Sequence, residues 1–375
     1  MKIGFDAKRL YKNFTGLGNY SRTLVHNLHS FFPEDEYYLY TPSIRQTPET
    51  EPFLDGNSYK KTIPQGGLKA YWRSYSIKKD LKKDRLSLYH GLSHEIPFGM
   101  KATGIKTVVT IHDIIYLTYP AMFTAIDRAI YDFKFRYSCK HADKIIAISE
   151  STKKDIIHYF GTPEEKIEVI YQALNPVFYD LPDKNSSKQL IQPYHLPEDY
   201  LLYVGAVNSR KNLLGIVKAL AILPEEFRLP LVIVGNGGDY KKEVIGYATE
   251  HHIADRLIWM TNLTDTRTLQ AFYQHARLFI YPSFYEGFGL PVTEALLSKV
   301  PVITAGVSSL PEAGGPHTLY VSPNDREELR EAIIRTLADT ELRKTMTEEG
   351  YDFAHRQFAP ERLTGQVHNL YHQLL

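Results

Sequence analysis

Short apolar runs alternate with helix-like patterns along both halves of this chain, and that alternation constrains the fold more than any other feature. Strand-like runs followed by amphipathic stretches, repeated many times, are typical of parallel sheets covered by helices. In the first half the predicted strands are 2–6, 37–40, 87–90, 107–112, 144–149 and 168–171. In the second half they are 200–205, 231–235, 257–260, 278–281, 302–304 and 319–321. The pattern therefore predicts an α/β fold with two parallel sheets.

The periodicity lapses between the two series, which marks a boundary between domains. Residues 175–198 are rich in Pro, Asp, Asn and Ser, and we expect them to form a linker. At 375 residues the chain is longer than one core usually supports. We therefore expect a first domain over residues 1–174 and a second over residues 199–357. The stretch 360–375 carries apolar residues at helical spacing.

Composition and charge argue against several classes of partner. With 44 basic and 43 acidic residues, the chain lacks the basic excess of a general nucleic-acid binder, so we expect no nucleic acid as a partner. The single cysteine, Cys139, permits no internal disulfide and is expected to be a core residue. No apolar run approaches the roughly 20 residues that span a bilayer, and the start lacks the apolar core of a signal peptide. We expect cytoplasmic residence, with or without peripheral contact at the inner face of the cell membrane.

Two carboxylates flank a glycine-rich turn in residues 282–295, Pro-Ser-Phe-Tyr-Glu-Gly-Phe-Gly-Leu-Pro-Val-Thr-Glu-Ala. The apolar run before it predicts a buried strand, and Pro291 suits the first turn of a helix. Glu286 is then expected in the turn and Glu294 in the opening turn of that helix. A carboxylate accepts two hydroxyl hydrogen bonds at once, so the pair suits a sugar joined to a ribosyl diphosphate. The plainer alternative is an ordinary connection in which Glu294 complements the helix dipole.

The full string resembles the E-x7-E signature of the retaining glycosyltransferases of family 4, and the resemblance extends over nearly the whole chain. It implies the GT-B fold, in which two Rossmann-like domains face one another across a cleft and a C-terminal helix, here 358–375, returns to the first domain. It also implies that Glu286 orients the donor sugar and that Glu294 holds the ribose. The donor-binding positions implied in this string are Gly287, Phe288, Gly289, Leu290 and Glu294.

Two candidate positions follow the first strand, in the loop Thr-Gly-Leu-Gly-Asn-Tyr at 15–20. Glycines before a helix can present backbone amides to a phosphate, although this loop lacks the third small residue of the dinucleotide fingerprint. A bare turn is the alternative. The resemblance implies that Gly16 and Gly18 contact the donor diphosphate and the acceptor, as the Gly-x-Gly-x-Tyr loop of the family does.

A histidine ends the run 107–112, and the carboxyl end of a buried parallel strand faces the ligand crevice of an open sheet. A lone histidine is more often structural than catalytic. The resemblance implies that His112 hydrogen-bonds the transferred sugar, and the sequence His-Asp-Ile-Ile-Tyr-Leu-Thr-Tyr-Pro is similar to a mannosyltransferase-like branch of the family.

Adjacent cations, Arg210 and Lys211, follow the first strand of the second series. Together they can neutralise a diphosphate leaving group, and cations at a helix N-terminus oppose the macrodipole unless an anion binds there. A solvated helix start is the alternative. The resemblance assigns them the diphosphate, and it places main-chain groups near Asn262 and Leu263 beside the nucleobase.

No Asp-x-Asp and no cluster with zinc spacing occurs, so we expect no metal and no cofactor beyond the donor substrate. Arg210, Lys211 and helix N-termini would then meet the phosphate charge. The resemblance implies retention of anomeric configuration, with the departing phosphate accepting the acceptor's proton. On that view neither Glu286 nor Glu294 is a nucleophile.

Residues 68–85 place Leu68, Tyr71, Trp72 and Tyr75 on one predicted helical face, followed by Lys78, Lys79, Lys82, Lys83 and Arg85. Aromatic residues beside lysines suit the surface of an anionic membrane, and an ordinary helix that packs its aromatic face is equally compatible.

The resemblance implies a glycosyltransferase that moves a hexosyl group from a nucleotide-diphosphate sugar to a glycan or lipid-linked glycan in surface polysaccharide biosynthesis. GDP-mannose is the first expectation for the donor. Donors with UDP-linked glucose or N-acetylglucosamine remain open, as do a sugar-nucleotide 2-epimerase of the same fold and a binding subunit without activity.

Overall fold

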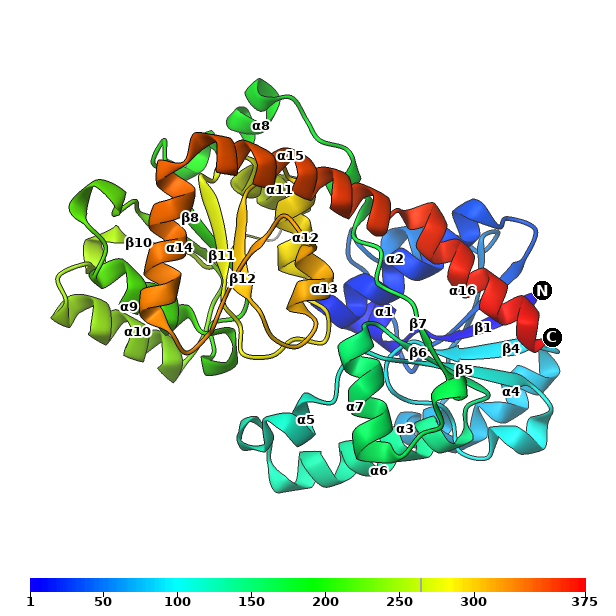
Figure 1. The fold of residues 1–375 in the computed structure, drawn as a ribbon. Helices are drawn as coiled ribbons and strands as arrows, with labels where there is room; N and C mark the ends of the chain where they lie inside the picture. Colours follow the sequence, from blue (N-terminus) through cyan, green and yellow to red (C-terminus); the bar gives the residue numbers. More distant parts are fainter. Residues whose placement is uncertain (264) are drawn as a thin grey trace. The chain divides into compact units, whose positions relative to one another are not determined.

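The computed structural model describes residues 1–263 and 265–375. The chain divides into two compact units, each built on its own parallel sheet (Figure 1). Unit 1 comprises residues 1–174 and 358–375, and unit 2 comprises residues 175–357. The two-sheet α/β architecture expected from the sequence is therefore confirmed.

Within the described residues, unit 1 holds a seven-stranded parallel sheet in the order β3-β2-β1-β4-β5-β6-β7. Its strands are β1 (Lys2–Asp6), β2 (Glu36–Tyr40), β3 (Tyr59–Thr62), β4 (Leu88–Gly91), β5 (Lys106–Ile111), β6 (Lys144–Ala147) and β7 (Ile167–Val169). Most residues of the central strands are buried because helices cover both faces of the sheet. The sequence missed β3, whose lysines suit an edge strand and mask its β pattern.

The helices of unit 1 include the C-terminal helix, as expected from the sequence. They are α1 (Lys8–Lys12), α2 (Gly16–Phe31), α3 (Lys69–Tyr71), α4 (Lys78–Lys83), α5 (Ile115–Thr118), α6 (Ala125–His141), α7 (Glu150–Phe160) and α16 (Pro360–Leu374), with a π-helical turn at Trp72–Ser76. Helix α16 packs on α2. Its His368 Nε2 lies 2.9 Å from Asp35 Oδ2, and its Tyr371 hydroxyl lies 2.6 Å from His90 Nδ1. The predicted return of the last helix to the first domain is confirmed.

Unit 2 holds, within the described residues, a six-stranded parallel sheet in the order β10-β9-β8-β11-β12-β13. Its strands are β8 (Leu201–Val204), β9 (Leu231–Val234), β10 (Leu257–Met260), β11 (Leu278–Tyr281), β12 (Val302–Ala305) and β13 (Leu319–Val321). Its helices are α8 (Lys184–Ile191), α9 (Leu213–Ala221), α10 (Asp239–Glu250), α11 (Thr266–His275), α12 (Leu290–Leu297), α13 (Leu310–Gly314), α14 (Arg326–Ala338) and α15 (Thr340–Gln357). Helix α9 contacts α10 and α14, while α11 contacts α8 and α12, so helices form two separate layers on this sheet (Figure 1).

The segment expected to be a linker is part of unit 2. Its helix α8 packs on α11, with the Ser187 hydroxyl 2.9 Å from His275 Nε2. Upstream of α8, the Gln270 side chain donates to the Val177 carbonyl at 2.8 Å. The short helix is capped by the Asp183 side chain, and the polar composition that suggested a linker reflects such caps rather than an unpacked connection.

Each sheet has a point where the chain reverses the direction in which it adds strands. In unit 1 this point lies between β1 and β4, and in unit 2 it lies between β8 and β11. The loops that follow the two strands at such a point run to opposite sides, which leaves a crevice at the carboxyl ends of the strands. We therefore expect the ligand-binding residues of each unit to lie at this crevice.

Cys139 is buried, and burial raises the pKa of its thiol to about 12, which confirms the expectation of a core residue. Across residues 1–263 and 265–375, no helix combines the length and apolar character required to span a membrane.

Candidate functional site

The loops after β8 and β11 meet at the strand-order reversal of unit 2. The loop after β8 begins at Gly205, and the neighbouring loop after β9 begins at Gly235. Their φ angles are +151° and +157°, and a Cβ on Gly235 would lie 1.9 Å from the Gly205 carbonyl oxygen. Only glycine fits both the backbone conformation and this close approach. The two glycines therefore let the loops after β8 and β9 lie close together.

An ion pair joins the two loops. Arg210 Nη1 lies 2.8 Å from Glu286 Oε1, and Lys211 Nζ lies 3.9 Å from the same oxygen. The side chains of Arg210 and Glu286 are 10% and 12% exposed, so this pair is nearly buried. Arg210 also donates to the Tyr285 carbonyl, and the Phe284 amide donates to the Arg210 carbonyl at 2.8 Å. The structure thus brings the adjacent Arg210 and Lys211 together with Glu286, which lies far from them in the sequence.

Glu286 receives its contacts on one oxygen. The Tyr281 hydroxyl donates to Oε1 at 2.8 Å and the Ser283 hydroxyl donates to Oε1 at 2.9 Å. Lys211 Nζ in turn donates to the Tyr281 hydroxyl at 2.6 Å. No hydrogen bond from a described residue reaches Oε2, so that oxygen remains available to a ligand hydroxyl. Tyr281 and Ser283 were not identified from the sequence, because a tyrosine in a buried strand and a serine in a turn look like ordinary core and turn residues.

Electrostatics keep Glu286 ionised. Burial by itself would raise the pKa of Glu286, but the charges of Lys211 and Arg210 and the hydrogen bonds it accepts hold that pKa below its ordinary value. Burial lowers the pKa of Lys211, which Glu286 opposes. Two cations therefore face one carboxylate, and the cluster has an excess of positive charge.

Glu294 occupies a different environment. The Tyr273 hydroxyl donates to its Oε2 at 3.0 Å. Burial raises the pKa of Glu294 to about 7, despite the opposing effects of Tyr273 and Lys211. The prediction that Glu294 lies in the opening turn was wrong: α12 begins at Leu290, and its first turn contains no acidic residue. Helix-dipole complementation therefore does not explain Glu294, because the carboxylate lies beyond the first turn.

The glycine turn between the two glutamates is held by serines. Gly289 has φ +113° and precedes α12. The Ser308 hydroxyl lies 3.0 Å from the Glu286 amide, which donates to it. The Ser309 hydroxyl interacts with the carbonyls of Glu286 and Phe288 at 2.8 and 2.9 Å. Gly287 and Phe288 are buried and Leu290 is half-buried, so the turn has a defined shape.

Asn262 and Leu263 do not join this cluster. They follow β10, the edge strand, which β9 separates from β8. Asn262 is exposed and Leu263 is half-buried. Their contact with a nucleobase stays a prediction.

Gly16 and Gly18 belong to unit 1 and lie in the first turn of α2, not in a loop before it. The Gly18 amide donates to Asn13 Oδ1 at 2.9 Å, and a Cβ on Gly18 would lie 1.7 Å from the Asn13 carbonyl oxygen. Gly18 is therefore required by this packing alone. A Cβ on Gly16 would meet nothing within 4 Å, so packing does not explain the glycine there.

His112 follows β5 in unit 1 and is buried. Its Nε2 donates to the Leu92 carbonyl at 2.9 Å, and Gln172 Nε2 lies 3.4 Å from its Nδ1. The Tyr20 ring meets it edge-on at 4.6 Å between centroids. Burial lowers the pKa of His112 to about 4, so the ring is neutral near pH 7. The structure places His112 at the predicted strand end with both nitrogens engaged inside unit 1.

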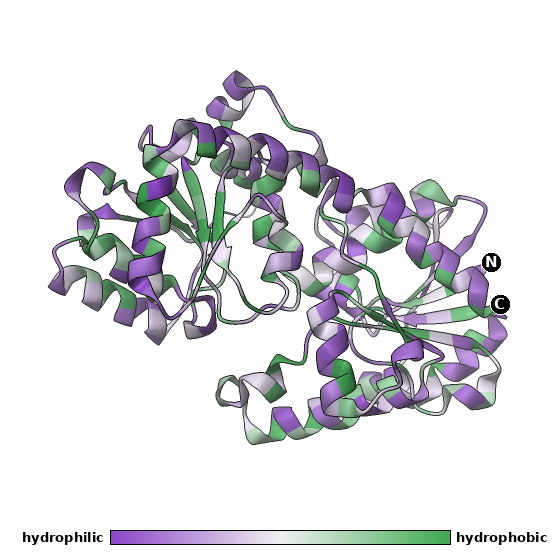
Figure 2. Cartoon of the chain, in the orientation of Figure 1, coloured by the Kyte–Doolittle hydropathy of each residue, from purple (hydrophilic) through white to green (hydrophobic). Residues whose placement is uncertain are grey.

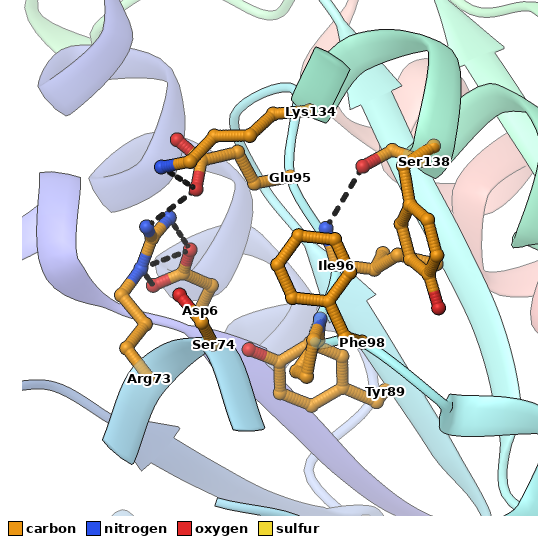
Figure 3. A pocket seen from close by; sticks show the side chains of 11 residues that line it. Asp6, Arg73, Ser74, Tyr89, Glu95, Ile96, Phe98, Lys134 and Ser138 are labelled. Atoms are coloured by element: carbon orange, nitrogen blue, oxygen red, sulfur yellow. Dashed lines mark hydrogen bonds and ion pairs between the residues drawn. The ribbon is translucent and has the colours of Figure 1, made fainter. Parts of the chain in front are cut away.

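A charged cluster that the sequence did not indicate lies at the carboxyl ends of β1 and β4 (Figure 3). Arg73 Nε donates to both oxygens of Asp6 at 3.1 and 3.0 Å, and Arg73 Nη1 lies 2.7 Å from Glu95 Oε2. Lys134 Nζ lies 3.1 Å from the same Glu95 oxygen. Burial by itself would raise the pKa of Glu95, but Arg73 and Lys134 hold it below its ordinary value. The cluster ties the π-helical turn and α6 to the strand-order reversal of unit 1.

Across residues 1–263 and 265–375, no group of three or more His, Cys, Asp or Glu side chains is arranged to hold a metal ion.

Family models match both units of the chain. A model described as glycosyl transferases group 1 matches residues 188–353, and one described as glycosyltransferase family 4 matches residues 14–177. The O-antigen chain mannosyltransferase B of Escherichia coli is 31% identical over 392 residues, and the match covers 99% of each chain. The O-antigen chain mannosyltransferase RfbU of Salmonella typhimurium is 27% identical, with 93% of this chain and 95% of the relative covered.

Solved structures share the fold at low sequence identity. The sucrose-phosphate synthase of Thermosynechococcus elongatus superposes with a TM-score of 0.80 at 21% identity, covering 100% of this chain and 99% of that one. The Anabaena protein Alr3699/HepE in complex with UDP-glucose superposes with a TM-score of 0.75 at 17% identity over 100% of both chains. At these identities the similarity speaks for the fold alone.

Proposed function

Because this chain belongs to the family 4 glycosyltransferases and has the GT-B fold, we propose that it transfers a hexosyl group, mannosyl in the first instance, from a nucleotide-diphosphate sugar. The acceptor in this proposal is a glycan or lipid-linked glycan, and the product contributes to a surface polysaccharide. Mannose is favoured by the two mannosyltransferase relatives, which act on O-antigen chains according to their names.

The observation that carries the proposal is the cluster of Arg210, Lys211 and Glu286 at the strand-order reversal of unit 2. Its surplus of positive charge suits a diphosphate, which must leave with developing negative charge. The unused Oε2 of Glu286 suits a hydroxyl of the transferred sugar. Glu294, which accepts one hydrogen bond from Tyr273, suits the ribose hydroxyls.

In the proposed reaction the bond between the anomeric carbon and the donor phosphate oxygen breaks, and the acceptor oxygen bonds to the anomeric carbon on the same face. The acceptor's proton passes to a phosphate oxygen of the leaving group. Arg210 and Lys211 stabilise that leaving group without a metal ion. The Arg210 ion pair keeps the Glu286 carboxylate ionised, and in this proposal the carboxylate orients the donor sugar and does not attack it. Detection of a covalent glycosyl adduct on Glu286 would contradict this mechanism.

Thermal unfolding with GDP-mannose, UDP-glucose and UDP-N-acetylglucosamine tests the donor, since a bound ligand stabilises the folded state by an amount that rises with the logarithm of its concentration over Kd. Stabilisation by GDP-mannose is expected. Stabilisation by a UDP-sugar alone would refute GDP-mannose as the donor, but it would not contradict the proposed glycosyltransferase activity. The structures of HepE in complex with UDP and UDP-glucose show that this fold can hold a UDP-sugar.

Product analysis by mass spectrometry, with and without a short mannose-containing oligosaccharide, tests the reaction. Extension of the oligosaccharide is expected, whereas a changed sugar nucleotide without acceptor would indicate an epimerase. Arg210→Gln is expected to abolish extension. Arg267→Gln is the matched control, because Arg267 is a surface cation that pairs with Asp180 outside the cluster. Equal activity of the two variants would contradict the proposal that Arg210 stabilises the diphosphate.

We also propose that unit 1 contacts an anionic membrane through an exposed apolar surface formed by Leu68, Tyr71, Tyr75, Ile126, Ile130 and Phe133. Leu68 is 81% exposed and Phe133 is 62% exposed. The rings of Tyr71 and Tyr75 stack at 5.4 Å, and Phe98 connects Tyr75 to Phe133 at 4.8 and 5.7 Å. The three residues on α6 follow helical spacing, and Figure 2 shows apolar segments along that helix.

The prediction that Trp72 shares one helical face with Leu68, Tyr71 and Tyr75 was wrong. The Trp72 ring is buried, and its Nε1 donates to Asp80 Oδ2 at 2.7 Å, so it does not share the exposed face. The alternative of an ordinary packed aromatic face does not fit Leu68, Tyr71 and Tyr75, which are exposed. The nearby lysines of α4 complement anionic lipid headgroups.

Flotation with vesicles of phosphatidylglycerol and phosphatidylcholine tests this surface. Binding is expected to anionic vesicles, to weaken with salt, and to fall when Lys78, Lys79, Lys82 and Lys83 are replaced by Glu or when Phe133 is replaced by Ser. Equal recovery with neutral and anionic vesicles, or no effect of either change, would refute membrane contact by these residues.

A further inference from the structure

His94 has two features that folding alone does not explain. It follows β4 in unit 1, next to the strand-order reversal, with φ +64°, a conformation uncommon outside glycine. The residue is 7% exposed, and its Nδ1 is fully buried without a hydrogen-bond partner. Both features cost stability. Strained backbone conformations cluster at functional sites, and a buried polar atom without a partner calls for an explanation.

The ring of His94 is nevertheless held in one orientation. It stacks on Phe135 with centroids 4.3 Å apart and planes 4° from parallel. It also meets the ring of His112 at 5.2 Å and 65°. The backbone amide of His94 donates to the Thr110 carbonyl at 2.9 Å, which attaches the loop to β5. The imidazole is therefore rigid and lies against the histidine that the sequence identified.

The tautomer of His94 follows from these contacts. Burial keeps the ring neutral by lowering its pKa well below the ordinary value. A buried N–H without an acceptor costs more than a buried lone pair, so the proton resides on Nε2 rather than Nδ1. Nε2 is not among the fully buried atoms without partners, and no described residue accepts from it. The chain thus maintains a rigid, neutral donor with no partner of its own.

We propose that His94 is a sugar-binding residue whose Nε2–H donates to a hydroxyl of a saccharide bound beside His112. The inference rests on the proposed glycosyltransferase function and adds a residue that the sequence motifs did not identify. A hydroxyl of the transferred sugar and one of the acceptor glycan offer the same chemistry, and steady-state kinetics distinguish them. The stacking on Phe135 fixes the direction of the donor and so favours one hydroxyl position.

His94→Phe separates binding from folding. Phenylalanine keeps the stacking on Phe135 while removing the buried nitrogen without a partner, so the melting temperature is expected to stay level or rise. The loss of one hydrogen bond to a sugar is expected to lower kcat/KM about tenfold. His94→Gln, which restores a donor, is expected to recover part of that loss.

The same substitution at His90 is a matched control. His90 is also buried, but its two nitrogens contact Tyr371 and Thr110 at 2.6 and 2.8 Å. His90→Phe is therefore expected to lower the melting temperature because it leaves both hydroxyls without that partner. The opposite responses of the two sites distinguish a ligand-binding histidine from a structural one.

The closing experiment measures kcat, the KM for GDP-mannose and the KM for the oligosaccharide with the wild-type chain and each variant. A selective increase in one KM identifies the substrate that His94 contacts, and a fall in kcat alone places the contact in the transition state. His94→Phe with kcat/KM within twofold of the wild type for both substrates would overturn the inference. Failure of the proposed function is distinguishable, because it appears as no transfer by the wild-type chain.

Discussion

Glu294 is expected to reduce the stability of the folded chain at neutral and alkaline pH. Burial raises its pKa from 4.5 to about 7, so the folded state retains a proton that the unfolded state has already released. The free energy of unfolding therefore falls as the pH rises from 4.5 through 7, and the penalty is complete above that value. The rise in pKa corresponds to about 3 kcal/mol, at about 1.4 kcal/mol per pKa unit.

Glu294→Gln removes this penalty while keeping an oxygen that accepts from the Tyr273 hydroxyl. At pH 8 the variant is expected to be more stable than the wild type by about 3 kcal/mol, and at pH 5 by about 1 kcal/mol. For a unit of this size the difference at pH 8 corresponds to an increase in melting temperature of about 6–12 °C. Binding of the nucleotide sugar is expected to weaken, because the amide accepts fewer hydroxyl hydrogen bonds than the carboxylate.

The assay is urea unfolding at pH 5 and pH 8, together with nucleotide-sugar titration at pH 8. Glu348→Gln is the control, because Glu348 is an exposed glutamate on α15 and its replacement is expected to change stability by less than about 0.5 kcal/mol at both values. A Glu294→Gln variant that is equally or less stable than the wild type at pH 8 would refute the reasoning. A stability difference that does not change between pH 5 and pH 8 would do the same.

Two further substitutions test the geometry of the same unit. Gly235→Ala is expected to destabilise the chain by about 2 kcal/mol or more, because a Cβ would lie 1.9 Å from the Gly205 carbonyl oxygen at φ +157°. Gly246→Ala, at an exposed position of α10 with nothing within 4 Å, is expected to stabilise by about 0.5–1 kcal/mol, and similar effects of both changes in urea unfolding would contradict the packing argument. Glu286→Gln is expected to cost about 3 kcal/mol because Arg210 loses its nearly buried counter-charge. Unchanged urea unfolding of that variant would show that the ion pair contributes nothing to stability.

Much of the fold was readable from the sequence because the signals that specify it are local. Apolar runs specified all the central strands, and the glycines and Pro291 indicated a turn into a helix. These signals depend on residues a few positions apart, so they can be recognised in the sequence without knowledge of tertiary contacts. The edge strand β3 was not predicted because lysines interrupt its apolar pattern. Helix α8 was not predicted because it is short and rich in polar residues that cap it.

The sequence also identified the residue types of the site without their environments. The sequence singled out Arg210, Lys211, Glu286 and Glu294. The tertiary structure, however, shifts the pKa values of the two carboxylates in opposite directions. Glu286 lies against two cations and stays ionised, whereas the half-buried Glu294 contacts one tyrosine and has a raised pKa. The difference arises from groups that lie up to 76 positions away in the chain and meet only after folding.

In unit 1 the same distinction applies to the histidines. The sequence placed His112 at a strand end, since strand direction is a local property. It gave no sign of His94 or of the cluster formed by Asp6, Arg73 and Glu95, because their significance depends on burial and on contacts between distant segments. Local patterns determined which elements form and where polar side chains leave the strands. Only tertiary packing decided which of those side chains find a partner and which remain available to a ligand, because desolvation and pairing depend on distances in space rather than on spacing along the chain.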